Sequence, residues 1–152
     1  MLKKIIILLS LMLLIGCGYA PIHSLKNNKE IKIKEIKFNY GDRQLNIYLE
    51  RKLRPFLSNE SKSLYELIVN TKYEKNTIAK DTTGAPSKYQ LKATVEFLIK
   101  FNGKTKILKF IEVFNMDHSN DDYENRVYED AIRQNFANSI YQKLISNLAQ
   151  SL

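Results

Sequence analysis

The chain of 152 residues contains one cysteine and two histidines, so few of its side chains are suited to nucleophilic or metal chemistry. The cysteine, Cys17, lies in the segment LLIGCGYAPIHSL, directly after Leu-Ile-Gly. A thiol nucleophile needs a base close to it in space, and the sequence alone leaves His23 and His118 open as partners. A lone cysteine excludes a disulfide within the chain. The residues around Cys17 therefore have to decide its role.

The residues before Cys17 have the pattern of an export signal. Lys3 and Lys4 make a positive start, and residues 5–15 are almost entirely apolar. This stretch is shorter than the ~20 apolar residues that span a bilayer, which argues against an uncleaved transmembrane anchor. The sequence Leu-Ile-Gly-Cys resembles the bacterial lipobox, in which the cysteine sulfur receives a diacylglycerol and the signal is cut before the cysteine. We therefore predict that residues 1–16 are a lipoprotein signal peptide and that Cys17 carries the lipid.

Gly18 follows the cysteine. In many bacteria an aspartate at this position retains a lipoprotein at the inner membrane, so the resemblance implies an outer-membrane anchor with the protein facing the periplasm. Removal of Lys3 and Lys4 lowers the formal charge from +8 to +6. Such a charge favours anionic partners, namely lipid phosphates or an acidic protein surface, and no nucleic-acid motif is present. AT-rich codon usage also enriches lysine, so the charge alone leaves both explanations open.

Residues 17–30 are expected to form the lipidated N-terminus and a tether, and residues 31–152 a single domain. Alternating apolar and charged residues predict a strand over 31–38, and a change of phase at Lys34-Glu35 indicates a β-bulge. Gly41-Asp42 offers a turn and a helix N-cap. Apolar residues at three- and four-residue spacing then predict an amphipathic helix that ends near residues 55–58.

Three further strands are expected. Residues 65–73 and 89–101 alternate between apolar and polar, with Leu98 as the apolar exception on a polar face, and the polar residues between the two strands form the connection. Asn102-Gly103 predicts a type I′ hairpin, because both central residues of that turn need positive φ. The partner strand, residues 104–116, is apolar on both faces. It is therefore either covered on both sides or has one face against another protein.

A long closing helix is predicted from Ser119–Asp122 to Leu148, with acidic residues at the positive end of its dipole. The order is thus β-α-β-β-β-α. An α+β fold, with an antiparallel or mixed four-stranded sheet and two helices packed on one face, satisfies both the strand alternation and the helix stripes. The expected core brings Tyr89, Leu91, Val95, Phe97 and Ile99 against Leu49, Leu53, Ile132, Phe136 and Ile140.

Three segments in this order resemble a known family. They are Gly18-Tyr19-Ala20-Pro21-Ile22 after the cysteine, Tyr89-Gln90-Leu91-Lys92-Ala93 at the start of a strand, and Glu129-Asp130-Ala131 ahead of the last apolar stripe. Together with the lipobox they are similar to the lipopolysaccharide (LPS) assembly lipoprotein family, LptE. The resemblance implies an outer-membrane lipoprotein that plugs the lumen of the β-barrel LPS-assembly protein LptD. It also implies a role in assembling that barrel and in delivering LPS to the outer leaflet.

The resemblance supplies no contact residues, because no local motif of this chain matches them. We take Lys92, Lys100, Lys104 and Lys106 as candidates for contact with LPS or the barrel, since charge-assisted contacts to phosphates or carboxylates suit lysine. The alternative is a solvated sheet face with an edge protected by lysine. A different envelope lipoprotein, such as an auxiliary component of a lipid-trafficking transporter or a secretin pilotin, also remains open.

An enzyme is not expected, because the sequence contains no P-loop, dinucleotide-binding turn, H-E-x-x-H, G-x-S-x-G or paired-cysteine motif. No cofactor is expected either. His118 lies near Asp117, Asp121 and Asp122, but the spacing matches no calcium loop. We interpret these acids as helix-capping residues and predict no metal site.

Overall fold

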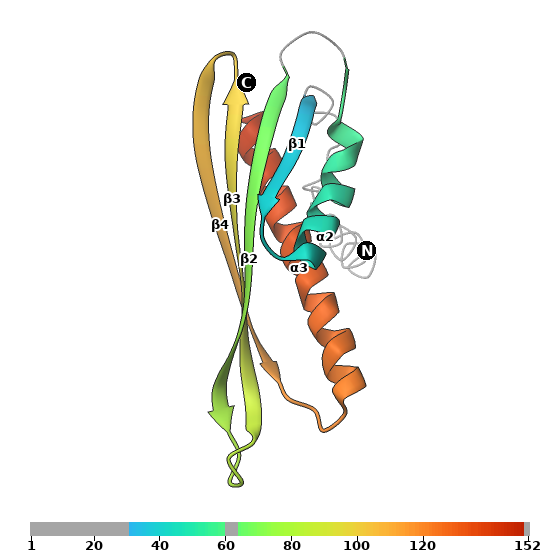
Figure 1. Ribbon diagram of the computed structural model, residues 1–152, viewed down its shortest axis with the longest axis vertical. Coiled ribbons are helices and arrows are strands. Elements are labelled where there is room, and N and C mark those ends of the chain that lie inside the picture. Colours follow the sequence, from blue (N-terminus) through green and yellow to red (C-terminus); the bar gives the residue numbers. More distant parts are fainter. Residues whose placement is uncertain (1–30, 60–63, 151–152) are drawn as a thin grey trace, which may run out of the picture.

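Figure 1 shows the computed structural model of the chain, which describes residues 31–59 and 64–150. The predicted anchor Cys17 and the boundaries of the signal and tether lie outside these residues. The elements in chain order are β1 (Ile33–Tyr40), α2 (Arg43–Leu53), the short 3-10 helix η3 (Arg54–Phe56), β2 (Tyr65–Lys80), β3 (Pro86–Phe101), β4 (Lys104–Asp117) and α3 (Asp122–Ala149).

The four strands form one sheet in the order β1-β2-β3-β4. β1 runs parallel to β2, whereas β2, β3 and β4 are antiparallel to their neighbours. Both helices lie on the same face of the sheet, and α3 runs along its length (Figure 1). The predicted α+β fold with a mixed four-stranded sheet and two helices on one face is confirmed.

Local signals in the sequence are found where they were expected. β1 shifts register between Ile33 and Glu35, which is the predicted bulge. The Asp42 side chain caps α2 by accepting a hydrogen bond of 2.8 Å from the Leu45 backbone amide. Asn102 has φ 48° and Gly103 has φ 75°, as a type I′ hairpin requires. These features fix how each element begins or turns.

The connection between β2 and β3 is shorter than predicted. β2 was expected to end at Tyr73, but it continues to Lys80, and β3 begins at Pro86 rather than Tyr89. Some of the added residues pair with one another, for example Ala79 with Lys88, and this pairing satisfies backbone groups on the side where β2 and β3 meet. Pairing, rather than burial, holds this part of the hairpin, which explains why it lacks the apolar alternation of a half-buried strand.

The hydrophobic core lies between the sheet and the two helices. Most of the expected residues are buried, and Leu49, Leu53, Val95, Phe97 and Ile140 are completely enclosed. Tyr89 is the exception, because it lies on the expected face and packs against the core but is only partly buried. Its ring meets His118, with centroids 5.6 Å apart, and the Lys75 amine lies 4.3 Å from its centroid. The completely buried members of the core also include Ile33, Leu45, Val69, Leu91, Ala93, Met116, Ala137 and Leu144.

Candidate functional site

The face of the sheet opposite the helices carries an apolar surface that no described residue covers. On β4, Leu108, Phe110 and Met116 turn toward α3, while the alternating residues between them turn to the bare face. Ile107, Ile111 and Val113 are 60%, 49% and 51% exposed there. Both faces of this strand therefore carry apolar residues, as predicted, and among the described residues only the face toward α3 is covered. That the other face meets another protein stays a prediction.

Neighbouring strands extend this surface. Ile107 pairs with Leu98 of β3, and Leu98 pairs with Ile68 of β2, so three half-buried or exposed apolar side chains cross the sheet in one row. We call Ile68, Leu98, Ile107, Ile111 and Val113 the outer patch. Contiguous apolar surface on a sheet face is typical of a protein-binding site. The signal in the sequence was Leu98, the apolar residue that breaks the polar alternation of its strand.

β4 is also an edge strand, because it has a neighbour on one side of the sheet only. It is 14 residues long, which is long for an edge that offers free backbone groups. Long apolar edges promote unwanted pairing, and natural sheets protect them with charged residues. Lys104, Lys106 and Lys109 supply that charge here, and Lys109 lies opposite Glu96.

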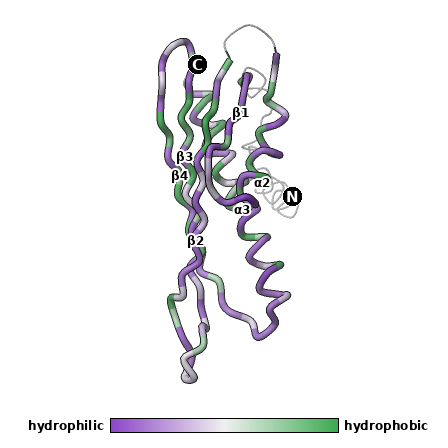
Figure 2. Tube along the Cα trace, viewed as in Figure 1, coloured by the Kyte–Doolittle hydropathy of each residue, from purple (hydrophilic) through white to green (hydrophobic). Residues whose placement is uncertain are grey.

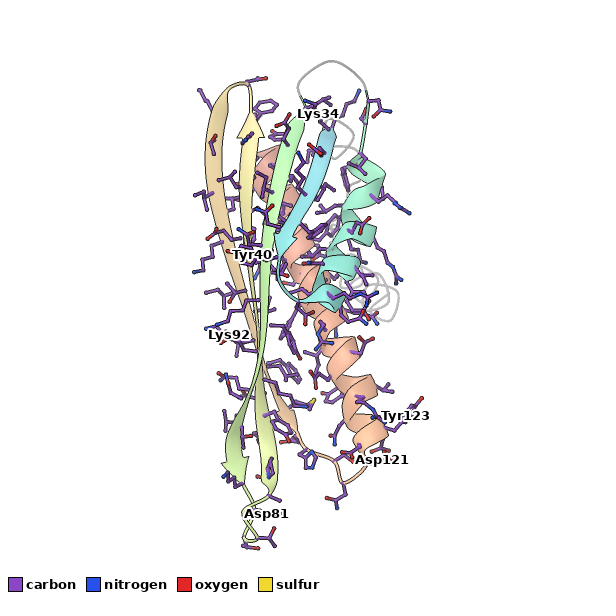
Figure 3. All side chains as sticks on the ribbon, in the orientation of Figure 1. Lys34, Tyr40, Asp81, Lys92, Asp121 and Tyr123 are labelled. Atoms are coloured by element: carbon purple, nitrogen blue, oxygen red, sulfur yellow. The ribbon has the colours of Figure 1, made fainter. Side chains whose placement is uncertain are left out.

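The four candidate lysines do not form one group. Lys92 and Lys100 lie on the bare face of β3, and Lys92 points away from the helices (Figure 3). Lys92 pairs with Val113, eight residues along the strand from Lys100, so it lies far from the Asn102-Gly103 turn. Lys104 and Lys106 pair with Phe101 and Ile99 and therefore lie on the helix-covered face.

Lys104 and Lys106 border a cavity at the end of the sheet. This hollow has a volume of about 250 Å³ and lies between the β3–β4 hairpin, the start of β2 and the last turn of α3. Its lining is mainly apolar and includes a stacked pair, Tyr65 and Phe101, with ring centroids 4.3 Å apart. We call it the hairpin cavity. It is lined by Tyr65, Ile99, Phe101, Lys104, Thr105, Lys106, Leu108, Asn147 and Leu148.

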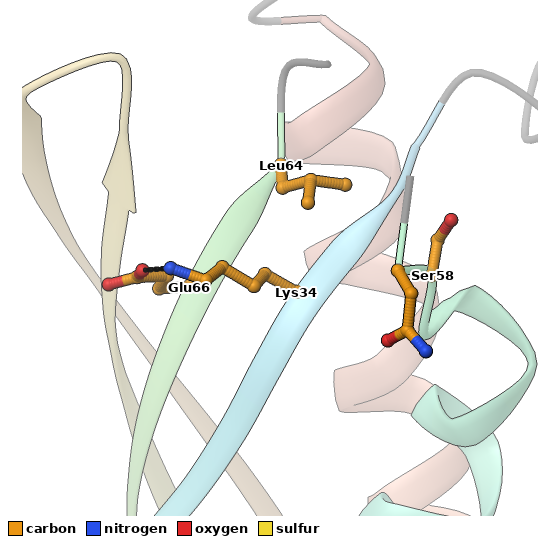
Figure 4. A pocket seen from close by; sticks show the side chains of 5 residues that line it. Lys34, Ser58, Leu64 and Glu66 are labelled. Atoms are coloured by element: carbon orange, nitrogen blue, oxygen red, sulfur yellow. Dashed lines mark hydrogen bonds and ion pairs between the residues drawn. The ribbon is translucent and has the colours of Figure 1, made fainter. Parts of the chain in front are cut away.

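A second hollow, shown in Figure 4, differs in chemistry. Lys34, Ser58, Asn59, Leu64 and Glu66 line it. The Lys34 amine lies 2.7 Å from the Glu66 carboxylate, and this hydrogen bond raises the pKa of Lys34 and lowers that of Glu66. The two side chains are 60% and 38% exposed to solvent, so the pair contributes little to stability. With its charges already paired, this hollow has little to offer a ligand.

The His118 ring contacts the side chain of Asn125. Its Nδ1 atom lies 3.0 Å from Nδ2 of Asn125, and Oδ1 of Asn125 accepts a hydrogen bond of 2.9 Å from the Ser119 backbone amide. Asp121 caps α3 by accepting a hydrogen bond of 2.7 Å from the Tyr123 backbone amide, and Asp122 lies in the first turn, as the interpretation of the acids predicted. The interpretation is wrong for Asp117, which is the last residue of β4 and whose carboxylate lies 3.1 Å from the Lys88 amine. Among the described residues, no three His, Cys, Asp or Glu side chains gather to hold a metal ion.

No helix in residues 31–59 or 64–150 is long and apolar enough to cross a membrane.

Solved structures share this fold. Rare lipoprotein B from Shewanella oneidensis superposes with a TM-score of 0.58 at 17% identity, covering 76% of this chain and 97% of its own. A minor lipoprotein from Acinetobacter baumannii gives 0.55 at 16%, covering 77% and 94%. Lipoprotein B from Nitrosomonas europaea gives 0.52 at 9%, covering 78% and 84%. No family model and no curated protein sequence matches the chain. At these identities the likeness shows a common fold, which here extends over nearly the whole length of each neighbour.

Proposed function

We propose that this protein is an outer-membrane lipoprotein of the LptE kind, facing the periplasm and anchored through Cys17. In this proposal it plugs the lumen of the LPS-translocating β-barrel LptD, assists the assembly of that barrel and helps to deliver LPS to the outer leaflet. Its role is binding, with no catalytic step and no cofactor. The lipobox-like Leu-Ile-Gly-Cys and the fold shared with three lipoproteins support the envelope location.

The observation that carries the plug role is the outer patch. A closed barrel has no free strand edge, so a plug has to contact its wall through side chains. The outer patch offers Ile107, Ile111 and Val113 on the bare face, beside lysines that suit acidic wall residues or lipid phosphates. A face of this kind is costly to leave in water and becomes favourable once a partner covers it.

Co-purification and depletion test the proposal together. The native protein, extracted in detergent, should carry a large β-barrel in one-to-one ratio, and its depletion should lower both surface LPS and the amount of folded barrel. If both quantities stay normal and no barrel co-purifies, the plug role is wrong and another envelope lipoprotein function replaces it.

Paired substitutions locate the contact. Ile107→Asp with Ile111→Asp places two charges in the outer patch and should release the barrel while the isolated protein keeps its melting temperature. The matched control is Tyr123→Asp with Val127→Asp, which adds the same charges at exposed apolar positions of α3, 67% and 52% exposed. Equal loss of barrel in both variants would remove the outer patch from the interface.

Substitution of lysines by glutamate tests the contribution of charge to the complex separately from that of the apolar contacts. Lys104→Glu with Lys106→Glu should weaken the complex or LPS transport if the hairpin enters the lumen. Lys92→Glu reverses a charge on the bare face, opposite Val113 of the outer patch, and should also weaken the complex if that face meets the barrel wall.

A further inference from the structure

The hairpin cavity has an apolar interior and a cationic border. Tyr65, Ile99 and Leu148 are at most 3% exposed, and with the Phe101 ring they form its apolar walls. Leu108, which is half-buried, completes the wall on the β4 side. At about 250 Å³ the hollow is below the ~300–1,000 Å³ typical of sites for whole drug-sized ligands. Its size and lining suit one flexible hydrocarbon chain.

The charges at the entrance are unbalanced. Among the described residues, Lys104 and Lys106 line the cavity and no carboxylate does. Within residues 31–59 and 64–150, neither lysine lies within ion-pair distance of an acidic side chain. Lysines that border an apolar wall hold their aliphatic stems against it and keep the amine at the water interface. The two amines are therefore free to meet an anion at the end of a chain held inside.

The N-terminal part of the chain enters the fold at the same end. Ile33, the first residue of β1, pairs with Tyr65, which is itself a wall of the cavity. The residues before the described part include Cys17, and the 14 residues from 17 to 30 limit how far the anchor lies from this point. At roughly 3.3–3.6 Å per residue, the tether places this end within about 50 Å of the anchoring membrane.

We propose that the hairpin cavity binds one acyl chain of an anionic phospholipid, with the lipid phosphate at Lys104 and Lys106. The apolar walls take the chain, the two amines neutralise the headgroup, and the tether keeps this end near a lipid source. An acidic peptide would satisfy the amines but would leave the deep apolar walls without a matching group. The proposal rests on the proposed lipid anchor only for the source of the ligand, because binding itself is measured without the anchor or the barrel.

The test uses the chain from residue 17 with Cys17→Ser, titrated with dihexanoyl phosphatidylglycerol as a monomer and followed by methyl NMR. Signals of Ile99, Leu108 and Leu148 should shift together and saturate. Dihexanoyl phosphatidylcholine, which has the same chains on a zwitterionic headgroup, should bind at least fivefold more weakly, and glycerol phosphate, which has no chain, should leave these methyl signals unmoved. Equal affinity for the two lipids, or shifts caused by glycerol phosphate alone, would overturn the proposal.

Variants distinguish binding in the hairpin cavity from a general attraction between the positive charge of the protein and the lipid. Lys104→Ala with Lys106→Ala should weaken binding about tenfold, whereas Lys92→Ala with Lys109→Ala removes the same charge from the bare face and should leave it unchanged. Leu108→Trp should fill the hollow and abolish binding while both lysines remain, and its melting temperature shows whether it has folded. Unchanged phospholipid binding by Leu108→Trp would contradict the proposal. An equal loss of binding in the two double lysine variants would contradict it as well.

A further variant tests whether residues 151 and 152 of this chain compete with the phospholipid for the cavity. A chain shortened to residue 150 should bind the phospholipid with unchanged affinity. If it binds at least tenfold more tightly, the last two residues of this chain occupy the cavity and the phospholipid does not. Failure of barrel co-purification, by contrast, would leave the phospholipid titration intact, so the two proposals fail separately.

Discussion

The two halves of the molecule are held together by different forces. In the half that contains β1 and α2, which we call the core half, completely buried residues such as Val69, Phe97 and Leu144 fill the space between sheet and helices. In the other half, the polar half, α3 meets the sheet through charged and aromatic side chains. Figure 2 shows hydrophobic residues concentrated along the core half.

The sheet narrows from one half to the other. β1 makes its last pair at Tyr40 with Asn70, so beyond that point β2 has a neighbour on one side only. β4 ends at Asp117 opposite Lys88, and the β2–β3 ribbon continues alone to the turn at Asp81. A narrow sheet covered by one helix encloses little volume away from water, so apolar packing gives way to polar contacts.

Polar contacts add to the packing in the polar half, where Leu91 and Met116 are still completely buried. Arg133 lies 4.0 Å from the centroid of the Tyr73 ring and 3.1 Å from the Glu129 carboxylate. Lys75 contacts the same carboxylate at 2.8 Å and also the Tyr89 ring. The comparison teaches that buried apolar side chains stabilise this fold where four strands and two helices meet. Ion pairs and cation–π contacts become more important where fewer elements meet.

The largest effect is expected in the core half. Phe136→Ala should lower the free energy of unfolding by about 3–5 kcal/mol, because the ring is 6% exposed within the core and its removal leaves a cavity. Tyr123→Ala is the matched control, an aromatic residue of the same helix that is 67% exposed, and should cost less than about 0.5 kcal/mol. Urea denaturation measures both. A loss below 1 kcal/mol for Phe136→Ala would contradict the register of α3.

A glycine at the border of the two halves gives the next effect. Gly41 has φ +135°, and an added Cβ would overlap the Thr71 carbonyl and hydroxyl oxygens, so Gly41→Ala should cost about 2–3 kcal/mol. Gly84, in the turn of the polar half, has φ +87° but open space around it. Gly84→Ala should therefore cost only about 1–2 kcal/mol of backbone strain. Equal melting temperatures for the two variants would exclude close packing between Gly41 and β2.

Arg133→Met tests the polar half directly. The variant keeps an apolar stem but loses the contacts to Glu129 and the Tyr73 ring, and should cost about 1–3 kcal/mol. Because the lost contacts are electrostatic, the difference from the parent protein should shrink as salt is added. Phe136→Ala should show no such salt dependence. Thermal unfolding at low and high salt separates the two, and a salt-independent Arg133 effect would mean that its stem matters more than its charge.

The smallest effect on stability is expected at a hydrogen bond between α2 and α3. The Tyr48 hydroxyl donates to the Asp130 carboxylate at 2.6 Å, and this bond holds the pKa of Asp130 below its ordinary value. A carboxyl group whose pKa is lower in the folded state than in the unfolded state stabilises the fold at pH values above its unfolded pKa of about 3.9. This contribution is lost as the pH falls through the pKa of the folded state. Tyr48→Phe should thus cost under about 1 kcal/mol at neutral pH.

The pH course of Tyr48→Phe is the decisive part of this prediction. Its difference from the parent protein should disappear in acid, below the folded pKa of Asp130, because the protonated carboxyl no longer gains from the bond. Tyr123→Phe, at an exposed position of α3, serves as control and should follow the parent at every pH. A Tyr48→Phe difference that stays constant into acid would show that the ring matters rather than the hydroxyl.

Local chemistry in the sequence determined the order of the elements and some of their limits. The cap at Asp42, the bulge after Ile33 and the hairpin at Asn102-Gly103 each depend on a few adjacent residues, so they could be predicted without tertiary structure. The apolar stripes of α3 and the alternation of β3 likewise specified which face is buried, because periodicity alone fixes that choice.

Tertiary structure decided what periodicity does not contain. Residues 74–80 form a strand because β3 lies beside them, although their own polar pattern resembles a loop. Lys100 and Lys104 are close in sequence but lie on opposite faces, since the register across the hairpin places Lys104 against Phe101. The hairpin cavity exists because the last turn of α3 meets Tyr65 and Phe101, residues far apart in the chain. Such sites arise from how elements are placed against one another, which side-chain spacing within one element cannot encode.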